Sequence, residues 1–124
     1  MRRLALIAVG VLGLGGCLTP SIPIPPPDPA EMDFAITLQD GVSTAAFTYP
    51  PDDNYKDSTY YVFNHDTGGG VFHVANPDGS IHALAIEATA GNQLVISIEG
   101  GAQTVSRCIV LREGAQDPNT YCSF

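Results

Sequence analysis

Four aspartates in the middle of the chain are the residues best suited, by type and spacing, to bind a metal ion. Asp52, Asp53 and Asp57 fall in one polar stretch, and Asp66 follows in the next. Calcium prefers carboxylate and carbonyl oxygens, and it needs roughly six to eight of them from a shaped loop. Lys56 stands inside the stretch, and the glycine of an EF-hand loop is absent. The spacing favours a solvated loop, with a calcium site as the alternative.

Three histidines provide a second set of possible metal ligands. His73 and His82 flank a turn at residues 76–79, so antiparallel pairing of the flanking strands would bring them near each other. His65 lies beside Asp66 in the chain. Histidines on strands and turns more often face solvent, so we expect no metal site here.

The residue patterns of common enzyme classes are absent from the sequence. No serine lies in a Gly-x-Ser-x-Gly elbow. The run Gly68-Gly69-Gly70 is not followed by the Lys-Ser/Thr of a phosphate loop. We find no carboxylate placed in an apolar run so that its pKa would be raised for acid catalysis. We therefore expect a protein that is not an enzyme and uses no cofactor.

Aromatic side chains concentrate between residues 49 and 63. Exposed aromatic rings beside acidic loops often form binding surfaces, because a rigid ring with a polar tip gives contact area at a low entropy cost. We predict a binding surface at Tyr49, Tyr55 and Tyr60, with Tyr55 and one of the other two exposed. The alternative is a structural cluster, with Tyr61 and Phe63 in the core.

The N-terminal segment is typical of a secretory signal. Arg2 and Arg3 follow Met1, and residues 4–14 are apolar or glycine throughout. A positive start and a short apolar run characterise such signals. The run of about 11 residues is too short to span a bilayer, which takes roughly 20.

The stretch Leu14-Gly15-Gly16-Cys17 resembles the bacterial lipobox, which has Leu, two small residues and then Cys. The resemblance covers residues 1–17. It implies that the Cys17 thiol receives a diacylglycerol, that the chain is cut before Cys17 and that the new amino group is acylated. Two or three acyl chains anchor a protein stably, where a single chain is marginal. Leu18 stands where an Asp would favour the inner membrane, so the resemblance implies the outer membrane. An ordinary signal peptide is the alternative.

Under that resemblance Cys17 carries lipid, which leaves Cys108 and Cys122. Two remaining thiols usually pair in the oxidising compartments outside the cytoplasm. Their disulfide would close a loop of about 15 residues, worth roughly 3 kcal/mol in the chain-entropy model. The spacing is not that of a CxxC motif, so we do not expect redox catalysis.

The chain beyond the signal is strongly acidic. The sequence has 13 acidic and 5 basic residues, and two of the basic residues are Arg2 and Arg3. The remainder therefore carries a net charge of −10. Such a surface repels nucleic acid and anionic lipid headgroups. This excludes nucleic-acid binding and is compatible with a cationic protein partner.

Prolines dominate the segment after Cys17, with six of them between Thr19 and Pro29. Proline fixes φ and removes the amide donor, so this density predicts an extended, disordered tether. We divide the chain into a signal peptide (1–16), a lipidated tether (17–32) and a folded domain (33–124).

From Asp33 onward, short runs rich in β-branched and aromatic residues alternate with turn residues, and no segment keeps a 3.6-residue period. The predicted strands cover 34–38, 42–49, 59–64, 71–75, 80–88, 93–99, 105–112 and 120–124. This all-β pattern of about seven or eight short strands predicts a single antiparallel β-sandwich. A small antiparallel β-barrel is the alternative.

Residues 78–96 resemble a motif of bacterial Ig-like domains, in which an Asp-Gly-Ser turn opens one strand and a Gly-Asn or Gly-Asp turn leads to the next. The resemblance is carried by Asp78-Gly79-Ser80-Ile81, Ala83, Ala88, Gly91-Asn92, Leu94 and Ile96. Asn92 stands where the family more often has Asp. The resemblance implies an Ig-like sandwich.

Together these patterns predict a lipid-anchored envelope lipoprotein, at the outer membrane, that displays a non-catalytic interaction or structural module. One alternative is an inhibitor or binding protein for a cationic envelope partner, similar to the small acidic lipoproteins that inhibit lysozymes. Another is a calcium- or carbohydrate-binding module. A contiguous acidic patch beside aromatic residues would indicate the inhibitor. A flat aromatic strip on one sheet would indicate the carbohydrate-binding module.

Overall fold

The computed structural model of the protein describes residues 23–123. The signal segment, Cys17 and the first part of the predicted tether lie outside these residues. Within them, no helix combines the length and the apolar character needed to cross a membrane.

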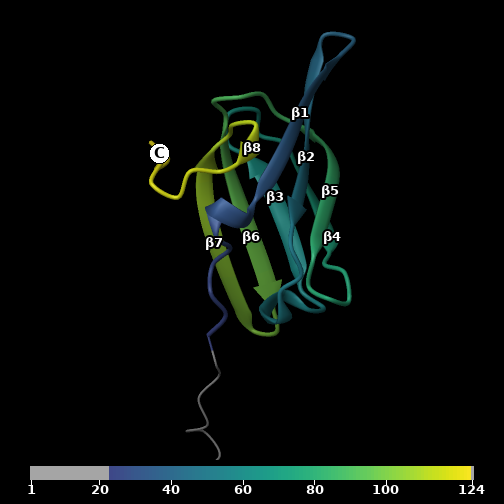
Figure 1. The fold of residues 1–124 in the computed structure, drawn as a ribbon, viewed down its shortest axis with the longest axis vertical. Coiled ribbons are helices and arrows are strands. Elements are labelled where there is room, and N and C mark those ends of the chain that lie inside the picture. Colours follow the sequence, from purple (N-terminus) through teal and green to yellow (C-terminus); the bar gives the residue numbers. More distant parts are fainter. Residues whose placement is uncertain (1–22, 124) are drawn as a thin grey trace, which may run out of the picture.

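The fold is a sandwich of two antiparallel sheets, β5-β2-β1-β8 and β4-β3-β6-β7 (Figure 1). Their strands are β1 (Asp33–Gln39), β2 (Val42–Tyr49), β3 (Thr59–Asn64), β4 (Gly70–Val74), β5 (Ile81–Glu87), β6 (Gln93–Gly100), β7 (Gln103–Val110) and β8 (Gly114–Ala115). Among the described residues no strand of one sheet pairs with a strand of the other. The β-sandwich prediction is therefore confirmed, and the barrel alternative is wrong.

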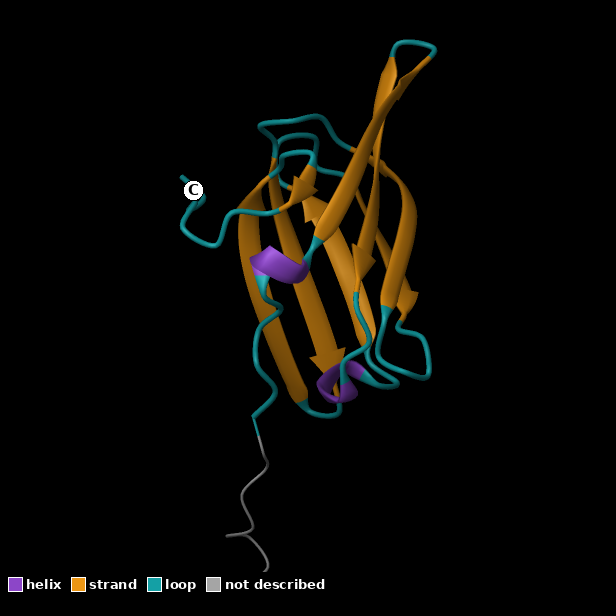
Figure 2. Ribbon diagram, viewed as in Figure 1, coloured by secondary structure: helices purple, strands orange, loops and turns teal. Residues whose placement is uncertain are grey.

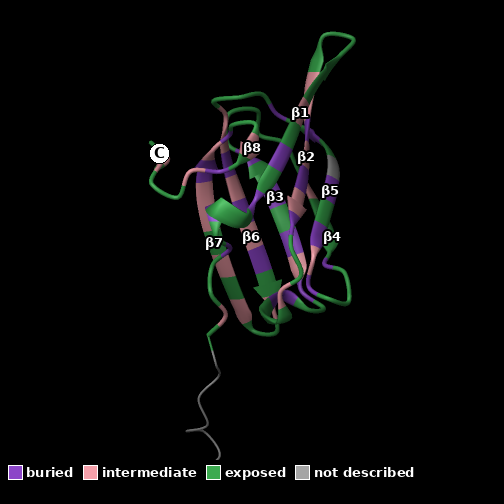
Figure 3. Ribbon diagram, viewed as in Figure 1, coloured by how far each residue is buried: buried purple, intermediate pink, exposed green. Residues whose placement is uncertain are grey.

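The core forms where alternate side chains of the two sheets meet. Tyr60 and Val62 of β3 are register partners of Ile98 and Ile96 of β6, and all four are buried. Phe34 and Phe47 face them from the other sheet as a tilted ring pair with centroids 4.8 Å apart. Figure 3 shows buried positions alternating with half-buried or exposed positions along these strands, as the two-residue period of a strand requires.

The first seven predicted strands agree with the structure to within two residues at either end. The eighth prediction is wrong, because residues 120–123 form no strand. The short strand β8 lies earlier and pairs Gly114 with Phe34 of β1. The backbone amide of Asn119 donates to the side chain of Asp117 at 2.8 Å, which closes a turn. This turn directs the chain away from the sheet before residue 120.

The folded domain begins before Asp33, so the predicted boundary and the predicted disorder are wrong for residues 23–32. Met32 is fully buried, and Pro27 and Pro29 are buried as well. Residues Pro29–Glu31 form a short 3₁₀ helix, η1, and Asp28 caps it by accepting from the Ala30 amide at 3.0 Å.

Side chains of the sandwich hold this proline-rich segment in place. The amide of Ile24 donates to the Gln103 side chain at 2.9 Å, and the hydroxyl of Tyr55 donates to the Pro25 carbonyl at 2.7 Å. Prolines bring no N–H group that would have to find a partner. A chain of this composition can therefore pack against a sandwich without leaving unpaired donors.

The β1–β2 hairpin extends beyond the body of the sandwich, at the end opposite to the N-terminal segment (Figure 2). Its turn residues Asp40 and Gly41 both have positive φ, 53° and 79°. This is the primed turn that matches the twist of a hairpin. Phe34, Ile36 and Leu38 share one face, as their alternation predicts, but Leu38 lies past the end of the core and is exposed.

Candidate functional site

The predicted binding surface at Tyr49, Tyr55 and Tyr60 is wrong, because all three side chains are 4 % exposed or less. Tyr60 shares its face of β3 with Val62, and that face points into the core. Tyr55 ends a second 3₁₀ helix, η2 (Asp53–Tyr55), and packs edge-on against Tyr49 with ring centroids 5.7 Å apart. These rings are structural.

The hydroxyls of the three tyrosines complete the structure around them. Burial raises the pKa of Tyr55, and the neighbouring Tyr49 and Asp52 add to this effect. Burial also raises the pKa of Tyr49, whose hydroxyl accepts from the Asp28 amide at 3.0 Å. Tyr60 donates to the backbone oxygen of His82 at 3.0 Å, and burial raises its pKa too. All three hydroxyls therefore stay neutral at physiological pH.

The four candidate aspartates do not converge on one site. Asp52 caps η2 by accepting from the Asn54 amide at 2.9 Å, and Asp53 forms an ion pair with Lys56 at 3.0 Å. Asp57 follows with a positive φ of 57°. Asp66 lies beyond the far end of β3, a strand that rises roughly 20 Å over its length.

The carboxylate of Asp66 is engaged with the start of β6, where it accepts from the Gln93 amide at 2.6 Å. Across residues 23–123 no three His, Cys, Asp or Glu side chains are grouped to hold a metal ion. His73 and His82 are exposed, on β4 and β5, and the ring of His73 lies 6.1 Å from that of Tyr60. The calcium hypothesis is therefore not supported by the placement of these residues.

Cys108 of β7 and Cys122 lie at disulfide distance, with their Cα atoms 6.0 Å apart. This is the pairing that the lipobox resemblance implied. The guanidinium of Arg107 adds a second connection by donating to the Pro118 carbonyl at 3.3 Å. The cysteine pair and the Arg107 hydrogen bond together hold the C-terminal segment beside β7.

Four apolar side chains lie exposed on the outer side of β3 and β4, and we call them the aromatic face: Tyr61, Phe63, Phe72 and Val74. Phe72 and Val74 are each 68 % exposed, Phe63 is 43 % exposed and Tyr61 is 37 % exposed. Tyr61 and Phe72 are cross-strand partners whose rings stack with centroids 5.9 Å apart. Neither β3 nor β4 carries a charged residue. Solvent-exposed apolar patches of this kind mark interaction sites.

The aromatic face continues onto β6 and ends at a carboxylate. Val95 lies opposite Phe63, and Ser97 lies opposite Tyr61. The hydroxyl of Ser97 is hydrogen-bonded to that of Ser106 at 2.8 Å. Glu99 is exposed and lies opposite Thr59, the first residue of β3. Val74 of β4 lies opposite Thr59 on the other side, so Glu99 and Val74 belong to one row across the sheet.

The aromatic face also borders a strand edge that no other strand covers. In an antiparallel pair, hydrogen-bonded and non-bonded residue pairs alternate. The amide of Ala75 donates to Ser58 at 2.8 Å, and that of Asn64 donates to Gly69 at 2.7 Å. Counting in steps of two from these bonds, Phe72 and Val74 belong to the non-bonded pairs. Their backbone N–H and C=O groups therefore point away from β3. Within the described chain β4 pairs with β3 alone.

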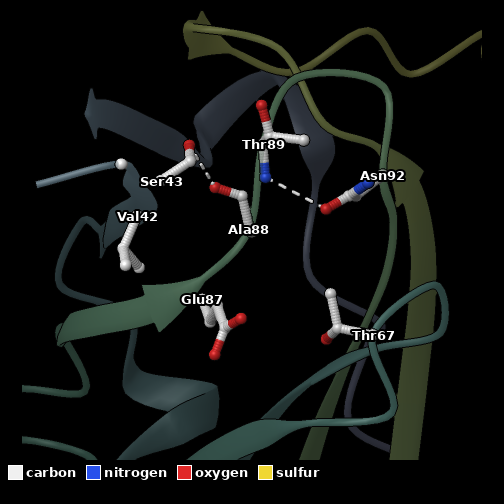
Figure 4. A pocket seen from close by; sticks show the side chains of 8 residues that line it. Val42, Ser43, Thr67, Glu87, Ala88, Thr89 and Asn92 are labelled. Atoms are coloured by element: carbon white, nitrogen blue, oxygen red, sulfur yellow. Dashed lines mark hydrogen bonds between the residues drawn. The ribbon is translucent and has the colours of Figure 1, made fainter. Parts of the chain in front are cut away.

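A pocket of about 190 Å³ lies at the base of the β1–β2 hairpin (Figure 4). Its lining comprises Gly41, Val42, Ser43, Thr67, Glu87, Ala88, Thr89 and Asn92. The hydroxyl of Ser43 donates to the Ala88 carbonyl at 2.7 Å, and the Thr89 amide donates to Asn92 at 3.0 Å. These polar groups therefore already have partners within the protein. Glu87 is the one charged side chain in the lining.

No protein-family model, no curated protein and no solved structure matches the chain. The function therefore has to be inferred from the arrangement of its own residues.

Sequence reasoning missed the aromatic face, because it placed the binding surface at Tyr49, Tyr55 and Tyr60 and considered Tyr61 and Phe63 only as core residues in the alternative. Both faces of β3 are apolar or aromatic, so alternation alone does not show which one points inward. Asn64 would have indicated the wrong side, because a polar amide suggests exposure, yet it is fully buried. The available signal was β4, an uncharged apolar strand in a chain with 13 acidic residues.

Proposed function

We propose that the protein is a lipid-anchored, non-catalytic module of the cell envelope that binds another protein through the aromatic face. The observation that carries this proposal is the uncharged patch of Tyr61, Phe63, Phe72 and Val74, exposed on an otherwise acidic molecule. Aromatic side chains supply much of the binding energy in protein interfaces. These rings also contribute little to the core, so the fold does not require them.

A protein fits this surface better than a glycan, although a strip of aromatic rings on one sheet is also typical of carbohydrate-binding modules. Sugar binding needs polar side chains beside the rings to bond the hydroxyl groups. Beside Tyr61 the hydroxyl of Ser97 is already bonded to Ser106. The backbone N–H and C=O groups of Phe72 and Val74 that point away from β3 can instead form hydrogen bonds with a polypeptide strand.

The membrane attachment in this proposal rests on the lipobox-like stretch that ends at Cys17. The chain is held to the sandwich from Ile24 onward, next to the β6–β7 turn. The six steps from Cys17 to Pro23 reach no more than roughly 20 Å. The sandwich is therefore held close to the membrane, with the β1–β2 hairpin at its far end.

A photo-crosslinking amino acid in place of Phe72 tests the binding surface in intact envelopes. The matched control places the same group at Leu38, which is similarly exposed but lies on the β1–β2 hairpin. We expect a discrete protein adduct from position 72 and none from position 38. Equal yields from the two positions, or an adduct to glycan only, would contradict the proposal.

A further inference from the structure

Among the described residues, other groups contact parts of the sheet edges at β1, β5 and β7, whereas no hydrogen bond reaches the outward backbone groups of Phe72 and Val74 on β4. Beside β1, the amide of Ile36 donates to the carboxylate of Glu113 at 2.8 Å, next to the β8 pairing. On β5, the backbone oxygens of His82 and Glu87 accept from the side chains of Tyr60 and Asn64.

Segments near both ends of the described chain contact side chains of β7. The N-terminal segment reaches it through Ile24 and Gln103, and the C-terminal segment reaches it through Cys108 and Cys122. Natural proteins protect free edges with proline, lysine or an inward-pointing charge. The sequence of β4, Gly-Val-Phe-His-Val, contains none of these. The edge of β4 is therefore open to pairing within the part of the chain that the structure describes.

The exposed side chains of β4 belong to the same residues whose backbone groups point outward. Phe72 and Val74 offer a neighbouring strand both main-chain hydrogen bonds and apolar contact. On the β4 side, Phe63 has only Gly70 opposite it, so its ring is also open to contact from that side. This combination is what strand addition uses, with backbone bonds for affinity and alternate side chains for specificity.

Acidic groups lie at both ends of this uncharged edge. Asp66 lies in the turn before β4, and Asp78 lies in the turn after it. The hydroxyl and amide of Ser80 donate to Asp78 at 2.6 and 2.9 Å and lower its pKa, and the charge of Lys56 adds a smaller effect. Glu99 adds a third carboxylate in the row of Val74.

This charge pattern identifies the occupant. A second copy paired antiparallel would place Asp66 of one molecule near Asp78 of the other, which brings like charges together. A strand with basic residues at its ends gains attraction at both turns. We infer, building on the function proposed above, that an extended segment of a cationic partner, apolar at alternate positions and basic at its ends, adds to the edge of β4.

The probe for this inference is a short synthetic peptide of alternating valine and threonine with a lysine at each end. It is titrated into the full-length protein in neutral detergent while the backbone amides are followed by NMR. We expect shifts and slowed hydrogen exchange at Phe72 and Val74. The same peptide with N-methylated amides should bind roughly tenfold more weakly or worse, because its backbone bonds are blocked.

Two further arms separate the contributions of charge and edge. A peptide with glutamate ends should also bind roughly tenfold more weakly at low salt, and the difference should shrink as salt screens the charges. Val74→Pro should abolish binding while the fold persists, because the Val74 N–H does not bond to β3.

The outcomes distinguish this inference from the function on which it rests. Equal affinity of the N-methylated peptide, or no change at Phe72 and Val74, would overturn strand addition. A photo-adduct at position 72 would still support the binding face in that case. Slowed exchange at these amides that depends on protein concentration alone would assign the edge to a second copy and would also overturn the inference.

Discussion

The side-chain amide of Asn64 donates to the side-chain oxygen of Asn92 at a distance of 3.0 Å. The same nitrogen donates to the backbone oxygen of Glu87, also at 3.0 Å, and the Asn64 oxygen accepts from the amides of Asp66 and Thr67. Asn64 ends β3 in one sheet, and Glu87 ends β5 in the other. One fully buried side chain therefore joins the two sheets near the base of the protruding hairpin.

Replacing Asn64 with alanine should lower the free energy of unfolding by about 2–4 kcal/mol, because several buried partners lose their hydrogen bonds together. Asn64→Asp should not rescue the loss, because a carboxylate cannot donate to Asn92 or Glu87. The control is Asn76→Ala, which removes only an exposed bond to Ser80. Urea unfolding measures all three variants. Equal losses for Asn64→Ala and Asn76→Ala would show that the buried network adds no more to the free energy of unfolding than one exposed hydrogen bond.

Stability should fall at alkaline pH because of the buried tyrosines. Tyrosine in an unfolded chain ionises near pH 10, whereas burial raises the pKa of Tyr55 in the folded state. Above about pH 10 the unfolded chain releases a proton that the folded chain keeps, so unfolding becomes easier by up to ~1.4 kcal/mol per pH unit for each such residue. Below about pH 10 the stabilisation is fully present.

Tyr55→Phe should flatten this alkaline decline and cost about 1 kcal/mol at neutral pH, because the bond to the Pro25 carbonyl is lost. The exposed Tyr121 provides the control, and Tyr121→Phe should change neither quantity. The measurement is denaturant unfolding from pH 7 to pH 11. An unchanged slope for Tyr55→Phe would contradict the assigned role.

Gly79→Ala should be far more damaging than Gly41→Ala. Both glycines have positive φ, 83° and 79°. A Cβ at Gly79 would overlap the backbone oxygen of Asp52, whereas one at Gly41 meets no atom within 4 Å. We expect a loss of about 1 kcal/mol for Gly41→Ala from backbone strain alone, and about 3 kcal/mol or more for Gly79→Ala. Thermal unfolding compares them, and similar losses would refute the close approach.

Cys17→Ser should release the protein from membranes, because the proposed acyl chains have no other attachment point. Fractionation of the producing cells measures the change. The control is the double variant Cys108→Ser/Cys122→Ser, which removes the cysteine pair of the sandwich and should remain in the membrane fraction. Membrane retention of Cys17→Ser would rule out the lipid anchor.

The strands could be predicted because local signals agree. β2, for example, lies between the turn at Asp40-Gly41 and the break at Pro50-Pro51, and its predicted bounds are those observed. The inward face of β3 could not be predicted in this way. It depends on Asn64 finding partners at Glu87 and Asn92, which are distant in the sequence.

The proline-rich segment shows the same limit. Its composition predicts an extended chain, and nothing local reveals that Tyr49 and Tyr55 will bond to Asp28 and Pro25. The same two hydroxyls explain why these tyrosines are absent from the surface. Local patterns therefore define strands and turns, whereas the binding face emerges only once the two sheets are packed together.

The most direct test of the aromatic face is the yield of the Phe72 photo-adduct after Tyr61→Ser. Tyr61 stacks on Phe72 and is partly exposed, so its loss should remove binding energy while changing the free energy of unfolding by no more than about 1 kcal/mol. We predict that the yield falls roughly tenfold or more, as for an interface residue that contributes about 1.4 kcal/mol or more. An unchanged yield in a stably folded Tyr61→Ser protein would contradict the account.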